Sequence, residues 1–91
     1  FAEAEKIDLT IVGPEFPLSL GLVDLFKARG LKIFGPSQAA ARLESSKAFC
    51  KEVMAEAGVL TPAAQIFSDR ESLENHIKSV GLPIVLKADG L

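Results

Sequence analysis

One lysine stands near the end of an otherwise apolar stretch close to the carboxyl end of the chain. Lys87 follows three aliphatic residues in segment 84–88, and strand alternation places it on the same face as Val85. If both faces of that strand are covered, the ammonium group must be paired or must meet an anionic ligand. A compact charge on a flexible stem suits phosphate oxygens. A lysine that extends from an edge strand into water would give the same pattern, and the residues favour neither interpretation.

A second lysine stands where a helix is predicted to begin. Lys47 follows Ser45-Ser46 and lies in the first helical turn, where the helix dipole disfavours a cation. A nearby anion would compensate for that placement. Lys51 comes one turn later and is expected on the surface. The residues alone favour a solvated Lys47 at an exposed helix start over a contact with a ligand.

A third candidate is the short connection Gly13-Pro14-Glu15, which joins the end of a strand to the start of a helix. In open α/β sheets, ligands bind outside such strand ends, and free backbone N–H groups at a helix start favour anions. Glu15 would repel a phosphate but could accept hydrogen bonds from a sugar hydroxyl or an amine. The alternative is a simple turn with Glu15 as a favourable first-turn acid, and the residues alone favour that alternative.

Two other reactive residue types occur once each. Cys50 follows Phe49 on a predicted helix and is expected to pack as a small hydrophobic residue, whereas His76 is expected to be exposed on the polar side of its helix. With one residue of each type, the sequence predicts no Cys/His metal site within the chain. A single cysteine cannot form an internal disulfide, which favours a reducing compartment, and we expect a cytoplasmic protein.

The first part of the chain alternates between strand and helix signals. Residues 7–12 form an apolar run with polar residues interspersed, which predicts a strand that Gly13-Pro14 ends. A helix then begins near Pro17, and Gly30 stands where its C-terminal cap belongs. Residues 31–34 predict a second strand, so the unit is β-α-β, with a parallel strand pair and a right-handed crossover. The apolar stripe of the helix comprises Leu18, Leu22, Leu25 and Phe26.

Two helices follow, and the break between them is the predicted domain boundary. Ser37 caps a short helix over 39–43, and Ser45-Ser46 interrupts it before the next helix begins. Before the break lies a β-α-β half of a doubly wound parallel sheet, and after it lies a series of helices and strands. We therefore expect an α/β chain with one domain over 1–44 and another over 45–91.

The remaining signals continue the alternation. The helix after the break ends at Gly58, and residues 63–67 predict a strand. The run Ser68-Asp69-Arg70-Glu71 is a capping box that opens another helix, which Gly81 ends. Residues 84–88 then predict the last strand.

The composition is that of an ordinary globular chain and excludes several classes of partner. The 91 residues include 10 basic and 12 acidic side chains, a net charge of −2, and 48% hydrophobic residues. No cluster of basic residues suggests binding to nucleic acid or anionic lipid, and no apolar stretch approaches the roughly 20 residues that span a bilayer. The length fits one small domain or parts of two. Because neither end resembles a natural domain boundary, we expect a piece of a longer chain.

Four motifs occur in order along the chain. They are Asp-Leu-Thr-Ile-Val-Gly-Pro-Glu-Phe-Pro-Leu over 8–18, Ile-Phe-Gly-Pro-Ser over 33–37, Leu-Glu-Ser-Ser-Lys-Ala-Phe over 43–49, and Pro-Ile-Val-Leu-Lys-Ala-Asp-Gly-Leu over 83–91. Each motif is weak alone, but four in order with compatible spacing are specific. Together they closely resemble the phosphoribosylamine–glycine ligase family, also called glycinamide ribonucleotide synthetases, and the resemblance covers essentially the whole chain.

That resemblance implies an ATP-grasp enzyme. Members of the family join glycine to 5-phosphoribosylamine, giving glycinamide ribonucleotide, ADP and phosphate through a glycyl phosphate, in de novo purine biosynthesis. Their substrates are small molecules, and their cofactors are ATP and Mg²⁺ or Mn²⁺. Residues 1–44 would then be the end of a doubly wound N-terminal domain, and 45–91 the start of the ATP-grasp module. We expect the isolated chain to be inactive, and the resemblance predicts no oligomeric state.

The same resemblance implies roles for five residues. Lys47 and Lys87 match the two ATP-grasp lysines and would hold ATP phosphates, which would supply the anion that Lys47 lacks. Gly13, Pro14 and Glu15 would contact phosphoribosylamine or its product. The metal ligands and the adenine site would lie outside this chain, and no catalytic residue is predicted within it. Alternatives are a different ATP-grasp carboxylate–amine ligase, or a non-catalytic α/β binding module.

Overall fold

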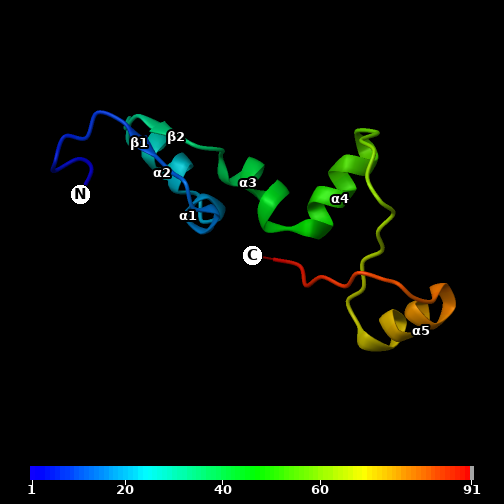
Figure 1. The fold of residues 1–91 in the computed structure, drawn as a ribbon. Helices are drawn as coiled ribbons and strands as arrows, with labels where there is room; N and C mark the ends of the chain where they lie inside the picture. The colour runs from blue at the N-terminus through cyan, green and yellow to red at the C-terminus, as the bar shows by residue number, and fades with distance from the viewer. Residues whose placement is uncertain (91) are drawn as a thin grey trace.

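The helices and strands follow one another along an extended path (Figure 1). The computed structural model describes residues 1–90. Its Cα radius of gyration is 18.4 Å and its principal extents are 59 × 27 × 19 Å, whereas a compact domain of this length has a radius of about 12 Å. In chain order the elements are β1 (Thr10–Ile11), α1 (Glu15–Ser19), α2 (Leu22–Ala28), β2 (Ile33–Phe34), α3 (Gln38–Ser45), α4 (Lys47–Glu56) and α5 (Arg70–Val80). Within residues 1–90, no helix combines the length and apolar character needed to cross a membrane.

β1 and β2 pair in parallel, as the β-α-β pattern predicts. Thr10 lies opposite Ile33 and Ile11 lies opposite Phe34, and the Thr10 N–H donates to Lys32 O at 3.0 Å. Both strands are two residues long and therefore shorter than predicted. This pair supports the α/β class, but two strands do not establish a doubly wound sheet.

The single helix predicted before Gly30 is wrong, because the chain forms two helices separated at Gly21. Gly21 is buried and has a φ of 83°, which favours glycine. A Cβ at this position would lie 3.2 Å from Gln38 Oε1. Gln38 also stabilises the break between the two helices by binding both of them. Its Nε2 donates to Ser19 O at 3.0 Å, and its backbone N–H donates to Asp24 Oδ2 at 2.7 Å. The start of α3 therefore packs where a continuous helix would have run.

The buried core is small and lies between the helices and the strand pair. The break at Gly21 also changes the predicted apolar stripe, because Val23 is fully buried whereas Leu25 is 51% exposed. Leu18 is buried, as the stripe predicts. The core comprises Leu18, Val23 and Ala41, with Val12 and Ile33 packed against it.

Two helix ends are confirmed at glycines. Gly30 has a φ of 69° and Gly58 has a φ of 65°. At the first of these, the N–H of Leu31 donates to Phe26 O at 3.0 Å, which is the hydrogen bond of a Schellman motif. Glycine adopts this backbone conformation without the steric cost that a side chain would add.

α3 and α4 meet at a sharp corner at Ser46. Ser37 caps α3 as predicted, because its Oγ accepts a hydrogen bond from Ala40 N at 3.2 Å. Across the corner, the guanidinium of Arg42 lies 3.9 Å from the centroid of the Phe49 ring. This cation–π contact joins the last turn of α3 to the first turn of α4.

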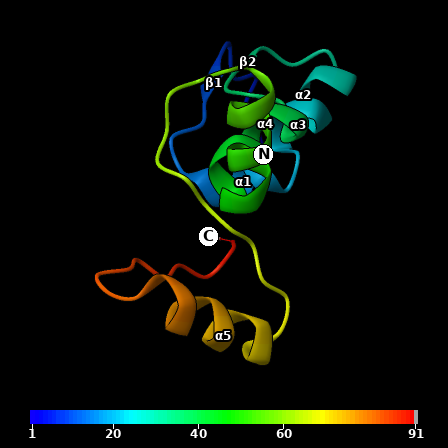
Figure 2. The same ribbon diagram turned by 90° about the vertical axis from the view of Figure 1, so that its right-hand side faces the viewer.

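The strands predicted over 63–67 and 84–88 are absent from the described residues. Both segments are extended connections, and they leave Ile66 56% and Val85 80% exposed. A strand needs a neighbouring strand to accept its backbone hydrogen bonds, and no such neighbour lies beside either segment within residues 1–90. In both ribbon views the segment after α5 returns toward α3 and α4 (Figures 1 and 2).

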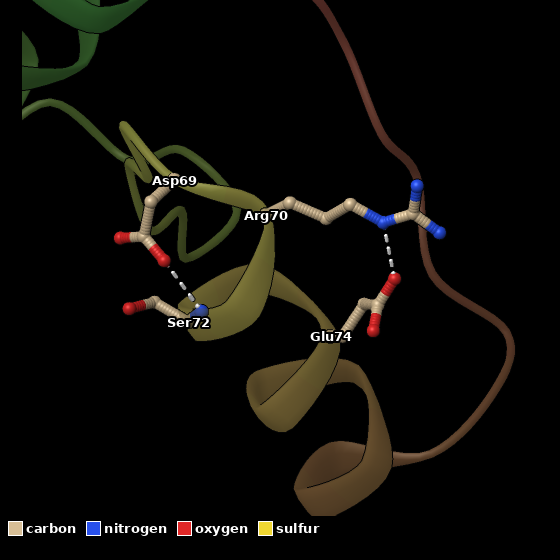
Figure 3. A network of polar contacts seen from close by, with 4 residues as sticks. All are labelled: Asp69, Arg70, Ser72 and Glu74. Carbon is tan, nitrogen blue, oxygen red and sulfur yellow. Dashed lines mark hydrogen bonds and ion pairs between the residues drawn. The ribbon is translucent and has the colours of Figure 1, made fainter.

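α5 begins one residue later than the predicted capping box implies. Its cap is Asp69 and not Ser68, and the Asp69 carboxylate accepts a hydrogen bond from Ser72 N at 2.8 Å (Figure 3). Arg70 and Glu74 form an ion pair on the exposed side of the same helix (Figure 3). The helix ends at Val80, before Gly81, as predicted.

Candidate functional site

The N-terminus of α4 is fixed by its own cap. Ser46 has an extended backbone, with φ of −133° and ψ of 111°, and its Oγ accepts a hydrogen bond from Phe49 N at 3.1 Å. This bond satisfies one of the N–H groups that no carbonyl within the helix can reach. Lys47 is therefore the first residue of α4, as the sequence predicts.

A carboxylate from the far end of the chain binds this same helix start. Asp89 Oδ1 accepts a hydrogen bond from Ala48 N at 3.0 Å. The Ser46 hydroxyl donates to Asp89, at 3.0 Å from Oδ2 and 3.2 Å from Oδ1. The segment that carries Lys87 is thus attached to the helix that carries Lys47.

The hydrogen bonds favour the ionised form of Asp89. The backbone N–H of Ala48, followed by the Ser46 hydroxyl, lowers the pKa of the Asp89 carboxyl group below its ordinary value of 3.8, and desolvation opposes this shift. The N-terminal end of the helix dipole also favours a negative charge here. Asp89 is therefore an anion at neutral pH, bound at the first turn of the helix that carries Lys47.

Lys47 extends from the helix start toward the same segment. Its Nζ donates a hydrogen bond to Gly90 O at 2.6 Å, and the residue remains exposed. An ammonium group has three N–H donors, and contacts within residues 1–90 use one of them. Asp89 binds the neighbouring amide of Ala48 and so brings a negative charge to the helix turn that carries Lys47.

Lys87 is exposed and lies in the extended segment after α5, not in a strand. Within residues 1–90 its ammonium makes no hydrogen bond or ion pair with another side chain or carbonyl. Asp89 lies two positions further along the chain, a separation that an extended chain covers in at most about 7 Å. The contacts of Asp89 therefore bring the backbone of Lys87 to the vicinity of the start of α4.

Gly13-Pro14-Glu15 joins the end of β1 to α1, as predicted, and all three residues are exposed. Pro14 is the N-cap residue with φ of −72°, and no side chain caps the helix. Glu15 is the first residue of α1, which begins two residues before Pro17 and so close to the predicted start. Within residues 1–90, no hydrogen bond or ion pair joins this group to Lys47 or Asp89.

Asp89 is the site residue that sequence reasoning missed. The Asp89-Gly90 pair has the composition of a turn, and nothing in its spacing points to a helix 41 residues earlier. The available signal was the placement of Lys47, because the helix dipole disfavours a cation at an N-terminus and a nearby anion would compensate for it. An aspartate close to Lys87 would have been a candidate for that anion within the chain.

The remaining candidate residues have structural surroundings. Cys50 is half-buried, as predicted, beside Met54 in an apolar hollow of about 440 Å³ between α3 and α4. His76 is half-buried and not exposed as predicted, because its ring centroid lies 5.1 Å from that of Phe67. Among residues 1–90, no three His, Cys, Asp or Glu side chains gather as a metal site would require.

Lys51 is occupied by a contact with the connection after α4. Its Nζ donates to Thr61 Oγ1 at 2.6 Å and to Pro62 O at 2.9 Å. The side chain is half-buried and holds residues 61 and 62 against the helix. Of the two lysines on α4, only Lys47 faces the segment that carries Lys87.

Comparison with protein families divides the chain between two models. Residues 1–44 match the model described as phosphoribosylglycinamide synthetase, N domain. Residues 45–91 match the model described as phosphoribosylglycinamide synthetase, ATP-grasp (A) domain. Lys47, Lys87 and Asp89 fall within the second match, and Gly13-Pro14-Glu15 falls within the first.

Curated relatives match the chain over its full length. A phosphoribosylamine–glycine ligase from Salmonella typhimurium and one from Escherichia coli strain K12 are each 55% identical over 91 residues, which is 100% of this chain and 21% of each relative. The same-named protein from Ralstonia nicotianae is 52% identical over 100% of this chain and 22% of the relative. The chain thus spans about a fifth of the length of these relatives. With both family models matched, the chain belongs to the phosphoribosylglycinamide synthetase family.

Proposed function

We propose that this chain is part of an enzyme that uses ATP to join glycine to 5-phosphoribosylamine. A glycine carboxylate oxygen attacks the γ-phosphorus of ATP, and ADP leaves to give glycyl phosphate. The amine of phosphoribosylamine then attacks the activated carbonyl carbon and loses a proton, and phosphate leaves. The products are glycinamide ribonucleotide, ADP and phosphate. The relatives named phosphoribosylamine–glycine ligase support this assignment.

The observation that carries the proposal is the meeting of two lysine-bearing segments at the start of α4. The hydrogen bonds of Asp89 and Gly90 hold the segment of Lys87 against the helix of Lys47. Two lysines on adjoining segments suit a polyphosphate, whose negative charge their ammonium groups neutralise. Among residues 1–90 the Lys47 ammonium uses one of its three N–H donors, and Lys87 is exposed, so both residues fit a role in holding ATP phosphates. Their task would be to orient the phosphates and stabilise charge on the transferring group.

The connection Gly13-Pro14-Glu15 is proposed to contact phosphoribosylamine or its product. Support comes from its exposure and from its position after a parallel strand, where α/β proteins commonly bind ligands. The carboxylate of Glu15 can accept hydrogen bonds from ribose hydroxyls or from the amine. It cannot favour the phosphate group, which carries the same sign of charge.

The division of labour between the two parts of the chain is also a proposal. Residues 1–44 would belong to the domain that binds phosphoribosylamine, and 45–91 to the ATP-grasp domain. The corner at Ser46, where α3 ends and α4 begins, supports a boundary at this position. Mg²⁺ or Mn²⁺ would be bound by residues outside this chain and would neutralise phosphate charge during the transfer.

The test replaces Lys87 by alanine in the full-length protein that carries this chain. Loss of an ammonium–phosphate contact should raise the KM for ATP about tenfold to a hundredfold. ADP release is measured with glycine and phosphoribosylamine present, and again with other carboxylates and amines. Lys78, which lies in the last turn of α5, provides a matched control, and Lys78→Ala should leave the KM within about twofold.

Three outcomes would overturn parts of the proposal. Unchanged ATP affinity and turnover in Lys87→Ala would remove the phosphate role. Turnover with another carboxylate or amine in preference to glycine and phosphoribosylamine would indicate a different ATP-grasp ligase. Absence of any ATP-dependent turnover by the full-length protein would favour a non-catalytic binding module.

A further inference from the structure

The attachment of residues 82–90 to the rest of the chain depends on very few contacts. Within residues 1–90, this segment forms no strand, and its hydrogen bonds to other elements come from Asp89 and Gly90. Val85 and Leu86 are 80% and 57% exposed, so apolar burial does little to hold it. The position of the Lys87 backbone is therefore set largely by the contacts of Asp89 and Gly90, which follow it two and three positions later.

From this geometry we infer that Asp89 is a positioning residue, which fastens the segment of Lys87 to the N-terminus of α4 and so sets the spacing between Lys87 and Lys47. The inference rests on the proposed function, because spacing between the two ammonium groups matters only if they hold one ligand. Asp89 acts through the lysines and is not itself proposed to contact the ligand.

The chemistry of the contact suits this role. A carboxylate that accepts hydrogen bonds from Ala48 N and the Ser46 hydroxyl is held at two points, which restricts its rotation. Hydrogen bonds to an ionised group are stronger than those between neutral groups. The two contacts are made to Ser46 and Ala48, which flank Lys47 in the sequence, so the carboxylate is held at the helix turn that carries this lysine. An arrangement formed in advance lowers the entropic cost of binding.

The test compares two aspartates in the full-length protein. Asp89→Ala removes a carboxylate bound to a helix amide beside the lysines, and Asp69→Ala removes a carboxylate bound to a helix amide at α5. We expect Asp89→Ala to lower kcat/KM for ATP about tenfold to a hundredfold, because a small displacement of a positioning contact has effects of that size. Asp69→Ala should change kcat/KM less than twofold, roughly as expected for a change distant from the site. Asp89→Asn keeps an acceptor oxygen and should recover most of the lost activity.

A double-mutant cycle separates positioning from direct ligand contact. If Asp89 acts through Lys87, adding Asp89→Ala to Lys87→Ala should produce little further loss in kcat/KM for ATP. Fully additive losses would overturn the inference, as would an Asp89→Ala variant with normal kinetics. Normal ATP kinetics in Lys87→Ala would contradict the proposed phosphate role of Lys87. Reduced activity in Lys87→Ala with normal activity in Asp89→Ala would contradict only the positioning role of Asp89. Thermal unfolding of both alanine variants shows whether an activity loss reflects a loss of folded protein.

Discussion

At the N-termini of both α4 and α5, an aspartate carboxylate accepts a hydrogen bond from a helix amide, but the two contacts have different structural roles. At α5, Asp69 is the residue directly before the helix, and its carboxylate accepts from Ser72 N. At α4, the local cap is Ser46, and a second acceptor, Asp89, comes from 41 residues away to bind Ala48 N. The α5 contact fixes where one helix begins. At α4, Ser46 fixes the start of the helix, and Asp89 joins that start to a segment distant in the sequence.

This difference shows why an acidic group at a helix start can have either a local or a long-range role. Both carboxylates are exposed, and hydrogen bonds lower the pKa of each below 3.8. Their electrostatic surroundings therefore do not distinguish them. What distinguishes them is the origin of the acceptor along the chain, which is the adjacent residue for α5 and a residue 41 positions away for α4.

Of the three changes that test this comparison, removal of the α4 cap should have the largest effect on activity. Removal of the α3 cap, which makes only a local contact, is its control. Ser46→Ala deletes both the cap of α4 and a donor to Asp89, whereas Ser37→Ala deletes only the cap of α3. Each change should destabilise its helix by about 1 kcal/mol. Only Ser46→Ala should also lower kcat/KM for ATP, by about tenfold. Hydrogen exchange of the Phe49 and Ala40 amides measures the helix effects, and equal activity of the two variants would contradict the comparison.

Lowering the pH should have an intermediate effect, because it weakens the contacts that the two aspartates make in the folded state. Because the folded-state pKa of each aspartate is lowered, its ionised form stabilises the native state above 3.8, and that contribution is lost as the pH falls through the folded-state value. Protonation of Asp69 should loosen only the first turn of α5. Protonation of Asp89 should also release the segment of Lys87. Carbon-13 signals of the two carboxyl groups report each titration, and simultaneous changes around Lys87 and Ala48 should accompany the titration of Asp89 alone.

The local elements were largely predictable from the sequence, because caps and glycine helix ends depend on neighbouring residues. Ser37, Gly30 and Gly58 act as predicted. The break at Gly21 was not predictable in this way, since it depends on Gln38 from a later helix. The absent strands follow the same rule, because strand pairing needs a partner that local sequence does not specify.

The candidate site likewise combines features that depend on adjacent residues with one that depends on a distant residue. Lys47 lies at the start of α4 because Ser46 caps the helix, and both facts could be derived from adjacent residues. The role of Asp89 depends on the chain returning to α4, which no periodicity in the sequence indicates. The residues singled out the two lysines as candidates, and the resemblance to a family predicts that they hold ATP phosphates. The contact that joins their segments became visible only in three dimensions.

The smallest effect is expected from an interaction on α5 that is neither a cap nor a long-range contact. Arg70 and Glu74 form an ion pair one turn apart, but the Arg70 side chain is 90% exposed and that of Glu74 is 45% exposed. Exposed pairs at this spacing contribute only about 0.3–0.5 kcal/mol, because water and salt screen the charges. Glu74→Gln should therefore lower the thermal unfolding temperature of the full-length protein by less than Ser37→Ala does, and leave kcat/KM for ATP unchanged. A loss of ATP kinetics in Glu74→Gln would show that α5 helps to position Lys87, and the contrast between its local role and the long-range role of the α4 contact would no longer hold.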